Sequence, residues 1–232
     1  MSNRYVSFVS DKDFLECVKW VCDAYPDKSK VVTMKSVQRN RIDPFKMVFD
    51  MTNSEISVDT WIKNEIVRQA DKTINNRIGE FHQKLLGKVK GWNDLGVGDD
   101  SKVDIKKEDG TVFIEIKNKF NTMNSDATAS CRRKLKNAVS KNTKAKAYWA
   151  YVVSKKGDSG ESVWVYGGEN NPRIRKIWGN RIYELITGEE DALENVWRAI
   201  PNAIRDLNNS GFITNESDNS RLVNFFRSAF FS

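Results

Sequence analysis

The sequence has little of the chemistry on which many enzymes and secreted proteins depend. His82 is the one histidine among 232 residues, which excludes a zinc site or a two-metal hydrolase centred on histidines. Three cysteines are too few for a disulfide framework, and their odd number also argues against one. This low cysteine content favours a cytoplasmic location. No apolar run approaches the roughly 18 residues that span a membrane, and the N-terminus lacks the apolar segment of a signal peptide. We therefore expect no membrane partner. We also expect that any metal ion is bound by carboxylates.

Positive charge exceeds negative charge, and it is unevenly distributed. The formal net charge is +7 and the pI is about 9.2. Between Ala127 and Gly157 the chain carries nine Lys or Arg residues and no Asp or Glu. A solvated helix face is the plain explanation of a basic run. A stretch of this length without one acid is more typical of a surface that follows the phosphates of a nucleic acid.

Periodicity and turn residues predict an α/β chain with a mixed β-sheet flanked by helices. Helices are expected from residue 11 to before Pro26, at about 58–88, 128–141, 189–207 and 218–231. Strands are expected at 102–106, 111–117, 147–153 and 162–166, the first two joined by a tight turn at Asp109-Gly110. Residues 46–51 fit either a short strand or part of a helix.

Three charged residues on the predicted hairpin form the clearest candidate site. Asp104 is expected in the first strand, and Glu115 and Lys117 in the second. Because side chains alternate along a strand, Glu115 and Lys117 share one face, and the turn brings Asp104 beside them. Two carboxylates and the backbone carbonyl of Ile116 can bind Mg²⁺ while leaving positions for water. Lys117 can orient the water, take its proton if its pKa is lowered, or stabilise a phosphodiester transition state.

A plainer explanation also fits these residues, namely a half-buried hairpin with a lysine–carboxylate pair across its strands. Three neighbouring features favour a catalytic site. The preceding loop, 92–101, is rich in glycine and aspartate, and the following segment, 118–124, is rich in amides. The basic helix comes directly after that segment. These surroundings suit a nucleic-acid substrate.

The sequence around the candidate site resembles the core motif of the PD-(D/E)XK nucleases. The matching residues are Val103-Asp104, with valine in place of the motif's proline, and Glu115-Ile116-Lys117. The strings EIKNKFNTMNS (115–125) and NRIGEFHQKLL (76–86) are similar to a small family of type II restriction endonucleases that cut GG-N-CC or GG-W-CC sites. The resemblance runs from the long helix to about residue 210. It implies a restriction-endonuclease-like core and a Mg²⁺-dependent enzyme that hydrolyses phosphodiester bonds at a short palindromic site in double-stranded DNA.

The resemblance also assigns roles to individual residues. Asp104 and Glu115 would be metal ligands, and Lys117 the catalytic lysine. Glu80, on the long helix, would join the metal site directly or through water, although a solvent-facing helix charge explains it equally well. His82, on the same helix, is interpreted as a helix-face residue and not as a catalytic base.

Residues expected to contact DNA follow the catalytic strand. The family string places four of them near the DNA backbone or bases: Asn118, Lys119, Asn121 and Asn124. The basic helix adds Arg132, Arg133 and Lys136, of which at least two can face one groove. For any single residue of the basic helix, phosphate contact or solubility is a simpler explanation than base reading.

The expected assembly follows from the symmetry of the site. A palindrome has two identical halves, so a homodimer is expected, together with a cognate DNA methyltransferase in the same system. Each chain is expected to be a single nuclease domain, 1–232, with a helical N-terminal part at about 1–90. Its catalytic sheet core is expected at about 91–168 and its C-terminal helices at about 180–232. Two alternatives stay open: a repair or recombination nuclease on the same core, and a non-catalytic DNA-binding module.

Overall fold

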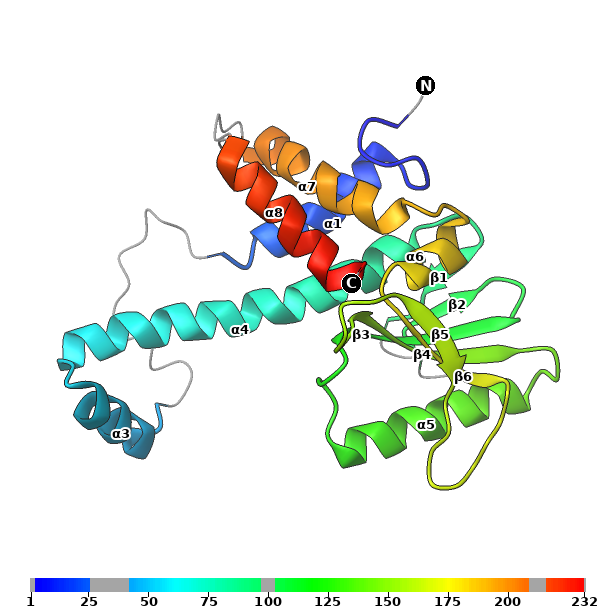
Figure 1. The fold of residues 1–232 in the computed structure, drawn as a ribbon, viewed down its shortest axis with the longest axis horizontal. Coiled ribbons are helices and arrows are strands. Elements are labelled where there is room, and N and C mark those ends of the chain that lie inside the picture. The colour runs from blue at the N-terminus through cyan, green and yellow to red at the C-terminus, as the bar shows by residue number, and fades with distance from the viewer. Residues whose placement is uncertain (1–2, 26–41, 97–102, 209–215, 232) are drawn as a thin grey trace. The chain divides into compact units, whose positions relative to one another are not determined.

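Figure 1 shows the computed structural model, which describes residues 3–25, 42–96, 103–208 and 216–231. Its elements follow in the order α1 (Asp11–Cys22), α3 (Pro44–Ser54), α4 (Val58–Gly87), β1 (Trp92–Asp94), β2 (Ile105–Lys107), β3 (Val112–Lys119), α5 (Ser125–Ser140), β4 (Lys146–Val153), β5 (Gly160–Val163), β6 (Ile174–Trp178), α6 (Asn180–Thr187), α7 (Ala192–Asn208) and α8 (Glu216–Phe230). The chain divides into two compact units, Trp20–Ile78 and the remainder, Met1–Lys19 with Gly79–Ser232. The smaller unit falls within the helical N-terminal part that the sequence predicts.

In the smaller unit, residues 46–51 belong to helix α3 and not to a strand. The side chain of Asp43 caps this helix by accepting hydrogen bonds from the backbone N–H groups of Phe45 and Lys46. Pro44 occupies the first helical turn, where its missing N–H costs nothing. The indole N–H of Trp61 on α4 donates to Asp50 of α3 at 3.0 Å, which ties the two helices together.

In the larger unit, the strands form one mixed sheet in the order β1-β2-β3-β4-β6-β5. Strands β3, β4 and β6 run parallel, and β1, β2 and β5 add antiparallel pairs at the two edges. The predicted hairpin is β2–β3, and Gly110 in its turn has φ +69, a conformation that suits glycine. The predicted strand at 147–153 is β4, which lies between two parallel neighbours and is therefore almost continuously apolar.

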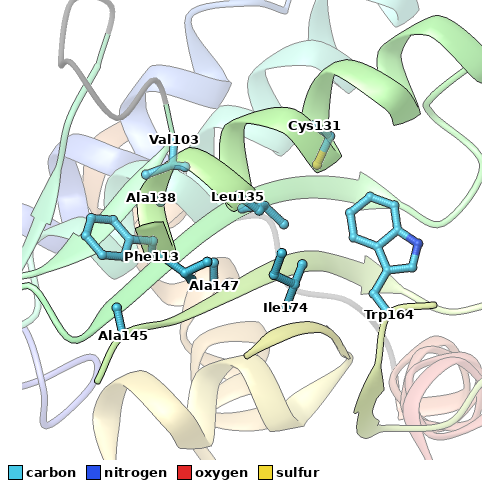
Figure 2. Close-up of a cluster of buried hydrophobic side chains, with 10 residues drawn as sticks. Val103, Phe113, Cys131, Leu135, Ala138, Ala145, Ala147, Trp164 and Ile174 are labelled. Atoms are coloured by element: carbon cyan, nitrogen blue, oxygen red, sulfur yellow. The ribbon is translucent and has the colours of Figure 1, made fainter. Parts of the chain in front are cut away.

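Helices cover both faces of this sheet, with α5 on one face and α6 on the other (Figure 1). The apolar side of α5 packs on the sheet through a cluster of buried residues drawn in Figure 2: Val103, Phe113, Cys131, Leu135, Ala138, Val139, Ala145, Ala147, Trp164 and Ile174. This packing fixes α5 over strand β3, whose alternate side chains point towards it. The mixed α/β fold that the sequence predicts is confirmed.

Three elements escape the sequence analysis. Strand β1 lies within the predicted loop at 92–101, of which residues 97–101 are outside the described residues. Strand β6 carries Arg175 and Lys176 in its middle, and α6 is only eight residues long. The predicted strand at 162–166 is also displaced, since β5 ends at Val163. Within the described ranges, no helix combines the length and apolar character that crossing a membrane requires.

Candidate active site

Asp104, Glu115 and Lys117 converge on one face of the sheet, as the sequence predicts. Asp104 lies one residue before β2, and its backbone N–H donates to the carbonyl of Ile114 on β3 at 3.1 Å. The Nζ of Lys117 lies 2.9 Å from Glu115 Oε1 and 3.5 Å from Asp104 Oδ2. The backbone N–H of Ile116 donates to Asp104 Oδ2 at 2.8 Å and fixes that carboxylate against the strand.

Glu115 is buried and the other two residues are partly buried, so their charges interact. The side chain of Glu115 is 5% exposed, and those of Asp104 and Lys117 are 21% and 29% exposed. Burial raises the pKa of Asp104, and the charge of Glu115 adds to the shift while Lys117 opposes it. Burial by itself would lower the pKa of Lys117, but the charges of Asp104 and Glu115 outweigh burial and raise that pKa. Lys117 is therefore an ammonium, suited to orienting water and stabilising charge; accepting a proton would need a lowered pKa.

A second lysine, which the sequence analysis did not assign, completes the cluster. Lys134 on α5 places its Nζ 3.0 Å from Glu115 Oε1 and 3.1 Å from Glu115 Oε2. It lies between Cys131 and Ala138 along the helix, on the side that faces the sheet. That helical spacing is the signal that could have identified it.

The donor set on β2 and β3 fits a magnesium ion. Mg²⁺ is commonly bound through one or two carboxylates, with waters and substrate phosphates completing its shell. Asp104 and Glu115 supply such a pair, and Ile116, whose carbonyl is the predicted third ligand, directly follows Glu115 on β3. In the part of the chain that the structure describes, no group of three or more His, Cys, Asp or Glu side chains is arranged to hold a metal.

Glu80 lies exposed on α4, one residue after Gly79. A methyl group at Gly79 would lie 3.8 Å from Asn118 Cβ, so this turn of α4 faces the end of β3. The position is compatible with the predicted role of Glu80 at the metal site, but that role stays a prediction.

The residues predicted from the family string differ in their surroundings. Asn118 is half-buried, whereas Lys119 and Asn121 are exposed. The side chain of Asn124 accepts a hydrogen bond from the backbone N–H of Ala127 at 2.9 Å and so caps helix α5. Capping α5 is therefore a structural role of Asn124, in addition to the DNA contact that the sequence predicts.

The basic residues of α5 do not form one surface. Arg132 is 3% exposed, its guanidinium lies over the ring of Trp164, and its Nη1 donates to the carbonyl of Trp164 at 2.8 Å. This burial does not favour the predicted contact of Arg132 with a DNA groove, and that contact stays a prediction. Arg133 and Lys136 are exposed three residues apart, and Lys136 pairs with Glu169 at 2.8 Å.

His82 is a packing residue between α4 and α6. Its Nδ1 lies 2.6 Å from the hydroxyl oxygen of Tyr183, and its ring meets the edges of Phe81 and Tyr183. Burial lowers the pKa of His82 to about 4, so the imidazole is neutral at physiological pH. These contacts account for His82 as the helix-face residue that the sequence predicts.

Comparison with known proteins shows the family to which the chain belongs. The sequence model of the Eco47II restriction endonuclease family matches residues 6–209. The chain is 36% identical to the type II restriction enzyme Sau96I of Staphylococcus aureus, over 89% of this chain and 82% of that protein. It is 34% identical to the type II restriction enzyme Eco47II of Escherichia coli, over 86% of both chains. Relatives of this identity and coverage, together with the family match, show that the chain belongs to the Eco47II restriction endonuclease family.

Proposed function

We propose that Asp104, Glu115 and Lys117 form the catalytic centre of a type II restriction enzyme that cuts double-stranded DNA with Mg²⁺ at a palindromic site. Family membership makes the chain a sequence-specific endonuclease, as the sequence predicts. The observation that carries the site assignment is the convergence of two enclosed carboxylates and an ammonium on one strand face. The resemblance to GG-N-CC and GG-W-CC enzymes supports a G·C-rich site of this kind.

The chain's own residues have distinct tasks in this proposal. Asp104 and Glu115 would hold the metal, and the N–H of Ile116 keeps Asp104 in its orientation. A bound Mg²⁺ would supply electrostatic stabilisation of the charge that develops on the phosphodiester, and activation of a water. Lys117, protonated and within reach of both carboxylates, would orient that water and stabilise the same charge.

The DNA contacts are proposed on the exposed residues near this face. Arg133 and Lys136 on α5, with Lys119 and Asn121 after β3, present cationic and amide groups suited to phosphates and base edges. A cognate methyltransferase is expected as the partner that protects the host's own sites. Two chains would act together on one palindrome.

Digestion of a plasmid of known sequence in Mg²⁺ tests the function. A type II enzyme yields discrete fragments whose mapped ends share one short palindrome. A structure-specific repair nuclease would instead cut at branched or damaged positions, and a non-catalytic binding module would shift the DNA without cutting it. Either result would contradict the proposal.

A further inference from the structure

We propose that Lys134, which pairs with Glu115, competes with the metal ion for that carboxylate. The inference rests on the proposed function, because it takes Glu115 as a metal ligand. It adds a second lysine, from a different element, to the residues that govern metal binding.

The contacts of Glu115 carry this inference. Both of its carboxylate oxygens lie within about 3 Å of Lys134 Nζ, and Lys117 Nζ reaches one of the same oxygens at 2.9 Å. The Glu115 side chain is 5% exposed, so water has little access to it. The two amino groups therefore contact the oxygens with which Glu115 would bind a metal ion.

Charge balance gives the reason for this arrangement. Two carboxylates, Asp104 and Glu115, face two amino groups, Lys117 and Lys134, so the formal charges of the cluster balance. A buried carboxylate is stable only when a cation or hydrogen bonds compensate it. A divalent cation would supply the same compensation, but it would repel an ammonium that stays on the same oxygens. Lys134 and the metal are therefore alternative partners of Glu115.

Of Lys117 and Lys134, Lys134 is the lysine that can move away from Glu115 when a metal ion binds. It extends from α5, a separate element from the strand that carries Glu115 and Lys117, and its side chain is 31% exposed. Solvent can therefore receive its ammonium. Lys117 also contacts Asp104 and stays bound to the cluster through that second carboxylate.

The same helix offers a matched control. Lys136 is two residues further along α5 and pairs with the exposed Glu169, and it has no recorded contact with Glu115 among the described residues. Lys136→Met makes the same chemical change as Lys134→Met, because it replaces an ammonium with an uncharged side chain of similar length. It does so without changing the partners of Glu115.

Calorimetric titration of DNA-free protein with Mg²⁺ alone tests the competition. Lys134→Met is expected to bind Mg²⁺ about tenfold more tightly than the unchanged protein, because the competing charge is gone. Lys134→Arg keeps the charge and is expected to stay within about twofold of the unchanged protein. Lys136→Met is expected to leave the affinity unchanged, and Glu115→Gln to lose binding.

The outcomes separate this inference from the function on which it rests. If Glu115→Gln loses Mg²⁺ binding while Lys134→Met binds no more tightly than the unchanged protein, the competition is overturned and the metal site stands. If Glu115→Gln binds Mg²⁺ as tightly as the unchanged protein, the metal assignment itself fails. Tighter binding by Lys134→Arg as well as Lys134→Met would show that packing, and not charge, governs the effect, and would also overturn the inference.

Discussion

The carboxylate of Glu115 is among the most enclosed charges in the described structure, and its partners explain how it is tolerated. It is 5% exposed and is compensated by ammonium groups from β3 and α5. A charge that the fold buries and compensates in this way suits a catalytic or metal-binding role better than a surface ion pair does. This enclosure makes Glu115 the residue whose replacement tests the site most directly.

We expect Glu115→Gln to lower the rate of cleavage by about three orders of magnitude or more, because a neutral amide is a poor magnesium ligand. DNA binding should persist, since removing negative charge near phosphates does not weaken the complex. Single-turnover cleavage in saturating Mg²⁺ and a gel-shift assay measure the two effects. Glu194→Gln, which changes a half-buried carboxylate paired with the exposed Arg198 on α7, is the control and should cut normally. Cleavage by Glu115→Gln at the rate of this control would contradict the metal assignment.

The pKa of His82 predicts a dependence of stability on pH. Its folded-state pKa of about 4 lies below the ordinary value of 6.5, because burial disfavours the charged ring. The folded state therefore binds this proton less readily than the unfolded state does, and stability falls as pH decreases from 6.5 towards 4. Between pH 7 and pH 4, the contribution of His82 amounts to roughly 3 kcal/mol of lost unfolding free energy.

His82→Asn removes this titration while keeping a polar partner for Tyr183. Denaturant unfolding of both proteins at pH 7 and pH 4 is the measurement. The carboxylates that titrate over this range are common to both, so the difference between the two losses isolates His82. Equal losses in the two proteins would show that His82 is already accessible to protons in the folded state.

At the level of whole elements, local signals decide what the sequence can predict. The hairpin follows from β-branched residues around Asp109-Gly110, and α4 follows from its long apolar periodicity. Strand β6 gives no such signal, since its middle residues are charged and its partners are distant in sequence. Its pairing with β4 and β5 supplies the hydrogen bonds that make it a strand, which is a tertiary effect.

The same limit applies to the site. Asp104, Glu115 and Lys117 could be grouped because a short turn joins their strands. Lys134 and Arg132 are two residues apart on α5 but have different partners. Lys134 contacts Glu115, and Arg132 contacts the carbonyl and ring of Trp164. Helical spacing puts Lys134 on the side of α5 that faces the sheet, but only the packing of α5 on that sheet brings it to Glu115.

Helix α4 offers a paired prediction on stability. A methyl group at Gly79 would make an ordinary contact, 3.8 Å from Asn118 Cβ, whereas one at Gly87 would lie 2.6 Å from the backbone N of Asp94. Gly79→Ala should therefore raise the unfolding free energy by about 0.5–1 kcal/mol, because alanine favours helix. Gly87→Ala should lower it, because the backbone at β1 must shift.

Thermal unfolding of the two variants and the unchanged protein measures this difference. The two glycines share one helix, so the comparison separates close packing from helix propensity. Loss of stability in Gly79→Ala would mean that the approach of α4 to β3 is tighter than the structure shows.

At the scale of the whole molecule, each chain has one proposed catalytic cluster among its described residues, which bears on how many chains act. Of the aromatic residues in α8, Phe226 and Phe230 are buried, and Phe226 stacks on Trp197 with ring centroids 4.7 Å apart. The structure therefore buries part of this C-terminal aromatic cluster within one chain. Leu222, Phe225 and Phe231 stay exposed and remain candidates for contact with a second chain.

Cutting both strands of a palindrome in one binding event requires two chains, because each scissile phosphate needs its own cluster. We expect sedimentation of the protein with a cognate duplex to give two chains per duplex. The side chain of Phe225 is 68% exposed. Phe225→Asp should lower the number of chains per duplex towards one and leave the melting temperature nearly unchanged. Asn224→Asp, its exposed neighbour on α8, adds a similar charge without removing apolar surface and should keep two chains. A one-to-one complex of the unchanged protein that only nicks supercoiled plasmid would contradict the dimer, and an unaltered Phe225→Asp complex would place the interface elsewhere.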